Sequence, residues 1–257
     1  MGCWRSASPP RRPPRSSSVT AVIAAAGSGE RLGAGGPKAF VPLAGRPMVE
    51  WSIAAFRAAP SIRSIVVACP PGHVHGLAGG DLRTVDGGAV RVQSVSNALA
   101  AVDTELVAIH DAARPLVTPD LIDGVVATLE ADPDAAGAIA AVPVTDTIKQ
   151  TKGVSGTPRR AFATYMGANA RLVIQATVDR DQLWAAQTPQ VFRVQALRQG
   201  LADEPERVAA ATDEAMLVEA AGGRVLIHPS PSENLKVTTP HDLRVAEMLL
   251  TQQSGRS

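Results

Sequence analysis

The sequence contains only two cysteines, Cys3 and Cys69. This number excludes a disulfide framework and any metal site built from several cysteines, and it makes the reducing cytoplasm the expected location. The apolar stretches are short, AVIAAA at 21–26 being typical, so we expect no membrane span. Basic and acidic residues number 25 and 24, which leaves no basic excess for binding nucleic acid.

Lysine is also scarce. The chain has 25 basic residues, and only four of them are lysines: Lys38, Lys149, Lys152 and Lys236. A lysine ammonium is a compact point charge, whereas the arginine guanidinium is a planar fork. We therefore take the lysines as candidate functional cations, with chance placement on a solvated surface as the alternative.

The first 18 residues contain four arginines, several serines and prolines, and no acidic residue. This composition predicts a disordered tail, and it lacks the apolar segment of a secretory signal. A misassigned start codon and a plastid transit peptide are alternative explanations of this segment. We expect the folded domain to span 19–251 and a flexible end to span 252–257.

From Val19 onward, apolar strands alternate with amphipathic helices. Strands are predicted at 19–26, 64–69, 105–110, 135–142 and 224–228, and helices near 47–59, 93–101, 118–130, 193–201, 212–221 and 239–251. This order predicts an α/β fold with a parallel sheet covered on both faces. Ligands of such sheets bind in the loops that follow the carboxyl ends of the strands.

Residues 143–190 interrupt this alternation. They contain two β segments joined by a polar, turn-rich region, which predicts a hairpin arm over about 143–183. An ordinary long surface loop is the alternative, although structureless loops of this length are uncommon.

A glycine-rich loop, residues 27–38, follows the first predicted strand. It does not match the dinucleotide fingerprint because Leu32 stands where glycine is needed, and it does not match a P-loop because Pro37 precedes the lysine and Ala39 follows it. The loop carries two cations, Arg31 and Lys38. Such cations can stabilise the charge that builds up on a triphosphate attacked at phosphorus, whereas a flexible loop with solvated cations is the alternative.

Two further turns follow predicted strands. Asp111 directly follows the strand predicted at 105–110. A carboxylate at this place can hold Mg²⁺ bridging phosphates, although an aspartate there can equally cap a helix. Asp86-Gly87-Gly88, with Arg91 and Ser94, forms a strand-to-helix turn suited to approaching a base or ribose.

Seven segments then identify a resemblance. In order they are AAAGSGERLGAGGPKAF, GGAVRVQSV, HDAARPLVTPDLI, PVTDTIK, TVDRDQLWAAQTPQVF, TDEAMLVEAAGG and ENLKVT. Together they resemble the 2-C-methyl-D-erythritol 4-phosphate cytidylyltransferase family over about residues 19–250. The resemblance implies a Rossmann-like, mostly parallel sheet of nucleotidyltransferase type, with a projecting β-arm that embraces a second subunit. It also implies transfer from CTP with Mg²⁺, giving a CDP-alcohol and pyrophosphate.

The resemblance also implies roles for particular residues. Transition-state stabilisation falls to Arg31 and Lys38, and positioning of the methylerythritol phosphate to Arg180 and Lys236. The nucleotide is wrapped by Ala25, Ala26, Gly27 and Gly29. Cytidine and ribose are contacted by Gly88, Ser94, Asp111, Ala112 and Arg114, with Asp111 near the metal. Hydroxyl groups on the substrate side belong to Thr147, Thr188 and Thr212.

The arm departs from the family pattern. Residues 156–160 (GTPRR) and 177–180 (TVDR) both look like the element that precedes LWxxQTPQ, with an extra stretch between them. We favour Arg180 because it lies at the family spacing from Leu183, and Arg160 is the alternative. Dimer geometry depends on this choice. Ala89 also stands where many relatives carry a polar residue.

The five histidines are scattered, and no Ser-His-Asp or Cys-His set is evident. None is needed if a phosphate monoester, with a second pKa of about 6, attacks as a dianion. Two other functions would share these features. One is cytidylyl transfer to another sugar-alcohol phosphate, such as ribitol 5-phosphate, and the other is that of a catalytically silent nucleotide-binding subunit.

Overall fold

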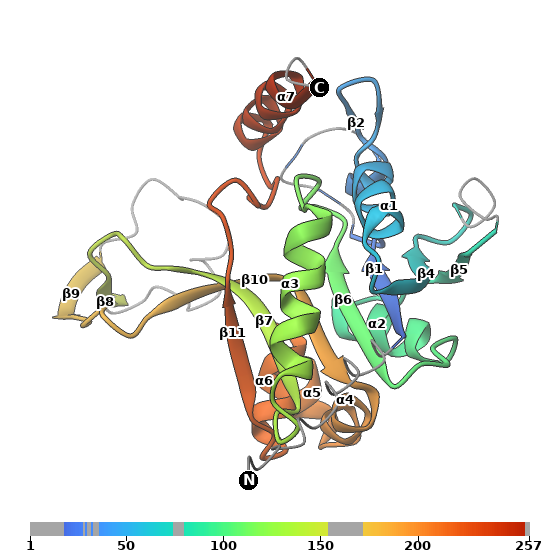
Figure 1. Ribbon diagram of the computed structural model, residues 1–257. Coiled ribbons are helices and arrows are strands. Elements are labelled where there is room, and N and C mark those ends of the chain that lie inside the picture. Colours follow the sequence, from blue (N-terminus) through green and yellow to red (C-terminus); the bar gives the residue numbers. More distant parts are fainter. Residues whose placement is uncertain are drawn as a thin grey trace, which may run out of the picture.

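The computed structural model describes residues 18–27, 29, 32, 36–73, 80–153 and 172–254. The predicted tail before residue 18, Arg31, Arg160 and the last three residues lie outside the described residues. The described chain forms a sheet in the order β11-β7-β10-β6-β1-β4-β5, with helices on both sides (Figure 1). Its strands are β1 (Val19–Ala24), β4 (Ile62–Cys69), β5 (Leu82–Asp86), β6 (Leu106–Asp111), β7 (Gly137–Pro143), β10 (Trp184–Arg193) and β11 (Val225–Pro229).

The parallel strands β1, β4 and β6 are apolar almost throughout because both faces of the sheet are covered. In β1, Ala21 and Ile23 join one core cluster, whereas Val22 joins the cluster on the other face. The first face is covered by α1 (Met48–Ala58) and α3 (Pro119–Glu130), and the second by α2 (Arg91–Leu99), α4 (Val194–Leu201) and α6 (Glu214–Ala220). The mostly parallel α/β sheet is thus confirmed.

The helices begin and end close to the predicted positions. The Thr118 hydroxyl accepts a hydrogen bond from the Leu121 amide at 3.2 Å and thereby caps α3, with Pro119 as its first residue. Helix α7 (Pro240–Ser254) continues past the expected end at residue 251, because no glycine or proline occurs before Gly255. Helix α5 (Pro205–Ala210) lies in a segment for which the sequence predicts no element.

Strand β10 is the main departure from the sequence expectation. LWAAQTPQ (183–190) directly follows the predicted arm, where the sequence predicts no strand of the main sheet, but it belongs to a strand that lies between β6 and β7 and runs antiparallel to both. The sequence does not predict this strand because Pro189 has no amide to donate to the ladder and therefore lowers the strand propensity. The register with β7 is interrupted between Ala186 and Gln190, so the intervening Gln187 and Thr188 leave the ladder and turn their side chains to other partners.

A separate two-stranded sheet lies within residues 143–183. Strands β8 (Lys149–Gly153) and β9 (Leu172–Thr177) pair antiparallel in a sheet of their own, and Figure 1 shows them projecting from the body. A further small sheet, β2 (Pro42–Leu43) with β3 (Arg46–Pro47), lies near α7. None of the helices among the described residues is long and apolar enough to span a membrane.

Replacing the α3 cap is expected to destabilise the fold. Thr118→Ala removes the side-chain acceptor for the Leu121 amide and should lower the free energy of unfolding by about 1 kcal/mol. Urea denaturation measures the change. Thr251→Ala is the matched control, since the Thr251 hydroxyl only bonds the Glu247 carbonyl on the exposed side of α7. Equal losses in both variants would contradict the capping role.

Candidate active site

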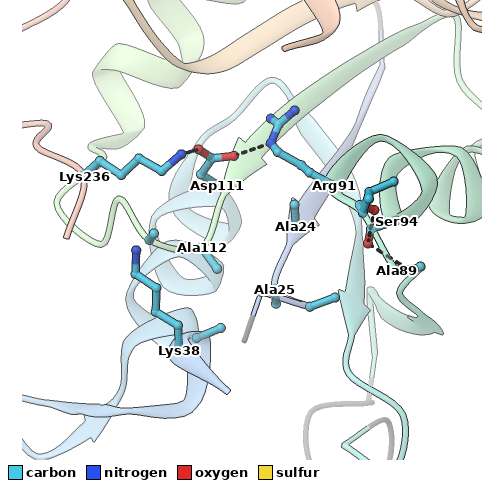
Figure 2. Close-up of a pocket in the computed structure, with 15 residues that line it drawn as sticks. Ala24, Ala25, Lys38, Ala89, Arg91, Ser94, Asp111, Ala112 and Lys236 are labelled. Atoms are coloured by element: carbon cyan, nitrogen blue, oxygen red, sulfur yellow. Dashed lines mark hydrogen bonds and ion pairs between the residues drawn. The ribbon is translucent and has the colours of Figure 1, made fainter. Parts of the chain in front are cut away.

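A cavity of about 390 Å³ lies at the carboxyl edge of the sheet. The register places Ala24 beside Asp111 of β6 and Ala68 of β4, and Cys69 beside Asp86 of β5, so the loops after these strands meet at one edge. The cavity is lined by residues that follow β1, β5 and β6, together with one lysine from the C-terminal segment (Figure 2). They are Ala24, Ala25, Ala26, Gly27, Lys38, Ala39, Gly88, Ala89, Val90, Arg91, Ser94, Asp111, Ala112, Ala113 and Lys236.

The glycine loop folds back on itself at Lys38. The Lys38 amide donates to the Gly27 carbonyl at 3.2 Å, and the 3-10 helix η2 (Lys38–Phe40) begins there. Gly29 has a φ of +72°, and a Cβ atom on it would lie 2.6 Å from the Lys38 Cβ. A glycine is therefore required at 29 for this close approach. Figure 2 shows the Lys38 ammonium pointing toward the space beside Asp111 and Lys236.

The turn after β5 is held by side chains of α2. The Gly88 amide donates to Ser94 Oγ at 3.0 Å, and Ser94 Oγ donates to the Val90 carbonyl at 3.2 Å. The Ala89 amide donates to Gln93 Oε1 at 2.9 Å, an interaction that sequence reasoning did not predict. A Cβ atom on Gly87 would lie 2.2 Å from the Ala26 Cβ. The turn therefore packs directly against the glycine loop.

Asp111 is the carboxylate at the centre of the cavity wall. Arg91 Nε lies 2.8 Å from its Oδ1, and Lys236 Nζ lies 2.6 Å from its Oδ2. Burial by itself opposes ionisation of Asp111, but the positive charges of Arg91 and Lys236 hold its pKa below its usual range. Asp111 is consequently a carboxylate anion at neutral pH, with both oxygens facing cations.

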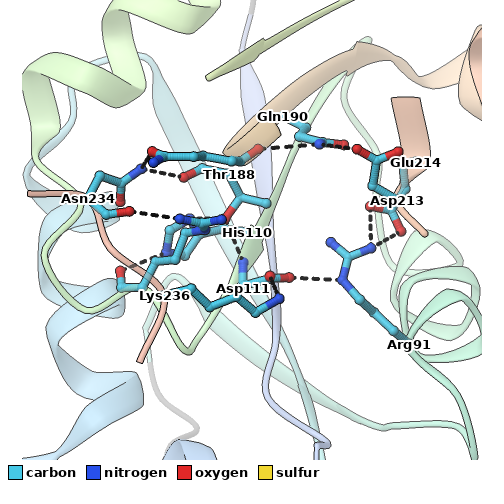
Figure 3. A network of polar contacts seen from close by, with 11 residues as sticks. Arg91, His110, Asp111, Thr188, Gln190, Asp213, Glu214, Asn234 and Lys236 are labelled. Atoms are coloured by element: carbon cyan, nitrogen blue, oxygen red, sulfur yellow. Dashed lines mark hydrogen bonds and ion pairs between the residues drawn. The ribbon is translucent and has the colours of Figure 1, made fainter. Parts of the chain in front are cut away.

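Arg91 joins Asp111 to a second carboxylate. Its Nη1 atom lies 2.6 Å from both oxygens of Glu214, the first residue of α6 (Figure 3). Burial raises the pKa of Glu214, and the same burial would lower that of Arg91, but the two carboxylates together raise the pKa of Arg91. The sequence predicts Arg91 in a strand-to-helix turn and gives no sign of a role for Glu214, because an acidic residue at a helix start is also favoured by the helix dipole.

A buried network supports Asp111 from behind. The Asp111 amide donates to Thr188 Oγ1 at 3.0 Å, and Thr188 Oγ1 lies 3.1 Å from His110 Nδ1. His110 Nε2 lies 3.2 Å from the Arg114 carbonyl, which can only accept, so Nε2 carries the ring proton and the Thr188 hydroxyl donates to Nδ1. Burial lowers the pKa of His110 to about 3, and hence the ring is neutral. Thr188 thus holds the backbone of Asp111, whereas the resemblance implies a hydroxyl facing substrate.

The C-terminal segment that carries Lys236 is tied to the same network. The Arg114 guanidinium is buried, and its Nη1 donates to the Asn234 carbonyl at 2.8 Å rather than lining the cavity. The Asn234 amide group donates to Gln187 Oε1 at 2.8 Å and to the Thr188 carbonyl at 2.9 Å (Figure 3). These bonds fix the position of residues just before Lys236.

Nine of the predicted site residues come together in the cavity lining, and three others lie elsewhere on the surface. The nine are Ala25, Ala26, Gly27, Lys38, Gly88, Ser94, Asp111, Ala112 and Lys236. Thr147 and Arg180 are exposed in the arm, where Arg180 Nη1 donates to the Thr145 carbonyl. Thr212 lines a different cavity, beside Trp184 of β10.

The side chains around the cavity indicate how the predicted Mg²⁺ could be bound. Asp111 is the single carboxylate in the lining, and no group of three or more His, Cys, Asp or Glu side chains suited to a metal occurs among the described residues. Mg²⁺ is commonly bound by one or two carboxylates together with substrate phosphates. The residues therefore fit a cation that arrives with a phosphorylated ligand, and not one caged by protein alone.

Comparison with known proteins gives one consistent result. The family model described as 2-C-methyl-D-erythritol 4-phosphate cytidylyltransferase (IspD) matches residues 19–252. The chain is 43% identical over 248 residues to the enzyme of that name from Frankia casuarinae, covering 94% of this chain and 85% of the relative. It is 41% identical over 250 residues to the one from Symbiobacterium thermophilum, covering 92% and 94%.

Solved structures agree with these matches. The crystal structure of the enzyme of the same name from Thermus thermophilus superposes with a TM-score of 0.70 at 33% identity, covering 90% of this chain and 98% of that one. The corresponding protein from Francisella tularensis gives a TM-score of 0.73 at 28% identity, covering 90% and 99%.

The buried His110 predicts a pH dependence of stability. Burial lowers its pKa from 6.5 to about 3 in the folded chain, so the unfolded chain binds more protons between these pH values. Stability is therefore complete above pH 6.5 and is lost as the pH falls, by about 2 kcal/mol from His110 alone between pH 7 and 5.

Urea denaturation at the two pH values tests this expectation with His110→Asn as the comparison. The asparagine does not titrate, and its oxygen can accept the Thr188 hydroxyl. The loss between pH 7 and 5 should be smaller in the variant by the contribution of His110. An equal loss in both proteins would show that His110 is not a neutral, buried ring.

Proposed function

Because the chain belongs to the 2-C-methyl-D-erythritol 4-phosphate cytidylyltransferase family, we propose that it transfers the cytidylyl group of CTP to 2-C-methyl-D-erythritol 4-phosphate. The products are 4-diphosphocytidyl-2-C-methyl-D-erythritol, an isoprenoid precursor, and pyrophosphate. One observation carries the proposal within the structure: Lys38 and Lys236 reach the same cavity as the Asp111 carboxylate, between a glycine loop and a strand-to-helix turn.

The nucleotide would occupy this cavity with its base at the turn after β5. Gly88 and Ser94 would face the cytidine, and the backbone of the glycine loop would wrap the triphosphate, since glycine permits close approach of amide groups to phosphate oxygens. Ala25, Ala26, Gly27 and Gly29 would form this loop contact, and Ala112 would lie beside the ribose. Lys38, with Arg31 from the same loop, would neutralise charge on the triphosphate.

The chemistry needs no protein nucleophile. An oxygen of the acceptor phosphate attacks the α-phosphorus of CTP in line, a new P–O bond forms, and the bond to the β-phosphate oxygen breaks to release pyrophosphate. The acceptor is largely a dianion at neutral pH, with a second pKa of about 6, so no general base is required. Lys38 stabilises the charge on the transferring group and Lys236 orients the acceptor phosphate.

Asp111 would hold a Mg²⁺ ion that enters with the triphosphate. When bound, the ion neutralises phosphate charge and helps the pyrophosphate to leave. The protein keeps Asp111 ionised for this purpose, because Arg91 and Lys236 hold its pKa low.

A second copy of the chain would complete the site. Arg180 and Thr147 lie on the projecting arm and do not line the cavity of their own chain. The arm also exposes Leu172, Val173 and Ile174, apolar residues suited to a protein contact. A homodimer in which each arm reaches the partner's cavity explains both observations.

The scarcity of cysteine further supports a cytoplasmic location.

The direct test supplies purified protein with Mg²⁺, CTP and 2-C-methyl-D-erythritol 4-phosphate and follows pyrophosphate release. We expect a CDP-linked product with this acceptor and little with ribitol 5-phosphate. Preference for ribitol 5-phosphate would reassign the substrate, and tight CTP binding without turnover of either acceptor would indicate a nucleotide-binding subunit.

Lys38→Ala is expected to lower kcat by about 100-fold or more, because the cation stabilises charge that develops in the transition state. The KM for CTP should change far less. Steady-state kinetics measure both constants. Arg63→Ala, which removes an exposed cation from β4 away from the cavity, is the matched control and should leave both constants unchanged. A loss confined to CTP affinity would contradict the assigned role.

The shared site predicts complementation between two inactive variants. Lys38→Ala loses the cavity cation and Arg180→Ala loses the arm cation. A randomly mixed dimer population contains sites that combine an intact cavity with an intact arm from the other subunit. We expect about a quarter of the wild-type activity after mixing equal amounts under subunit exchange. If each arm served its own cavity, mixing would restore nothing.

A further inference from the structure

Glu214 is a buried carboxylate that the proposed transfer does not use. It begins α6, only 1% of its surface is exposed, and both of its oxygens lie 2.6 Å from Arg91 Nη1. The start of α6 is itself fixed, since Asp213 accepts a hydrogen bond from the Met216 amide at 3.1 Å and from Gln190 Nε2 of β10 at 2.9 Å. Glu214 therefore presents its charge to Arg91 from a well-anchored helix end.

Four charged side chains form a series of contacts, a line of ion pairs in which positive and negative groups alternate. Lys236 contacts Asp111, Asp111 contacts Arg91, and Arg91 contacts Glu214, with nitrogen–oxygen distances of 2.6, 2.8 and 2.6 Å (Figure 3). Their formal charges cancel. If Lys236 leaves this line, Asp111, Arg91 and Glu214 together carry one negative charge, which favours an incoming cation at Asp111.

The two cations that contact Asp111 are held differently. The Arg91 guanidinium is fixed from its other side by Glu214, and its side chain is 29% exposed. The Lys236 side chain is 42% exposed, and Asp111 is its one salt-bridge partner among the described residues. A flexible lysine with one such contact exchanges more easily than a guanidinium held by two carboxylates.

We propose that Glu214 is a positioning residue: by holding Arg91 it fixes the Asp111 carboxylate, which would hold the divalent cation that enters with the triphosphate. Lys236 would then give up its contact with Asp111 and turn toward the acceptor phosphate. This inference rests on the proposed function and adds to it an order of events, in which Lys236 occupies the cation position until the nucleotide arrives.

A contribution to fold stability is a weak explanation for the buried ion pair between Glu214 and Arg91. Buried ion pairs contribute little net stability, because the loss of hydration offsets their attraction. Residues that orient a metal-binding carboxylate, by contrast, commonly change metal affinity by about 10- to 100-fold when they are replaced. Metal affinity is therefore the property that distinguishes the two roles.

The test measures Mn²⁺ binding by electron paramagnetic resonance to the full chain complexed with α,β-methylene-CTP, a CTP analogue that cannot react. Glu214→Gln keeps the shape of the side chain and removes its charge. We expect its Kd for Mn²⁺ to rise about tenfold and its kcat to fall by a similar factor. Glu219→Gln removes the same charge from an exposed position of α6 and should change neither value.

Two further variants keep the test decisive if Glu214→Gln does not fold. Glu214→Asp retains the charge and should recover part of the Mn²⁺ affinity, whereas Arg91→Lys retains the charge but loses the two-sided contact and should weaken Mn²⁺ binding. Mn²⁺ affinity within about twofold of wild type in the folded Glu214 and Arg91 variants would overturn the proposal, even with a lowered Tm. Failure of the wild-type protein to turn over methylerythritol phosphate, with Mn²⁺ binding changed as expected, would instead count against the substrate assignment.

Discussion

The ion pairs of Asp111 connect parts of the chain that are far apart in sequence. Arg91 comes from the helix after β5, Lys236 from the segment before α7, and Thr188 holds the Asp111 backbone from the central strand β10. A buried carboxylate needs such partners, because an unpaired charge at this depth would lose its hydration without compensation. The contacts of Asp111 therefore hold together the segments that line the cavity.

The same arrangement accounts for the type of chemistry. The cavity presents lysines, loop amides and an ionised carboxylate, and its neighbouring histidine is held neutral by burial with a pKa of about 3. Such a site positions charged groups and stabilises charge. Phosphate attacking phosphate requires only this. The family assignment and the geometry therefore lead to the same reaction class by separate routes.

Local patterns were enough for much of the architecture. Unbroken apolar runs such as that of β1 predict strands buried on both faces. The structure adds the helix caps, in which the side chains of Thr118 and Asp213 accept hydrogen bonds from backbone amides of α3 and α6. Strand β10 is not predictable in this way, because Pro189 and the polar residues around it are unfavourable for a strand inside a sheet. Its place between β6 and β7 depends on contacts with both neighbours, which no local pattern contains.

The amino-acid sequence by itself determined the α/β class, the glycine loop with Lys38, and the family motifs that contain Asp111 and Lys236, since each depends on residues close together in the chain. Only the tertiary structure decided which side chains face each other. It set Glu214 against Arg91, turned Arg114 away from the cavity, and left Thr147 and Arg180 outside the cavity lining of their own chain. Those outcomes depend on strand order and register, through which residues more than a hundred positions apart become neighbours.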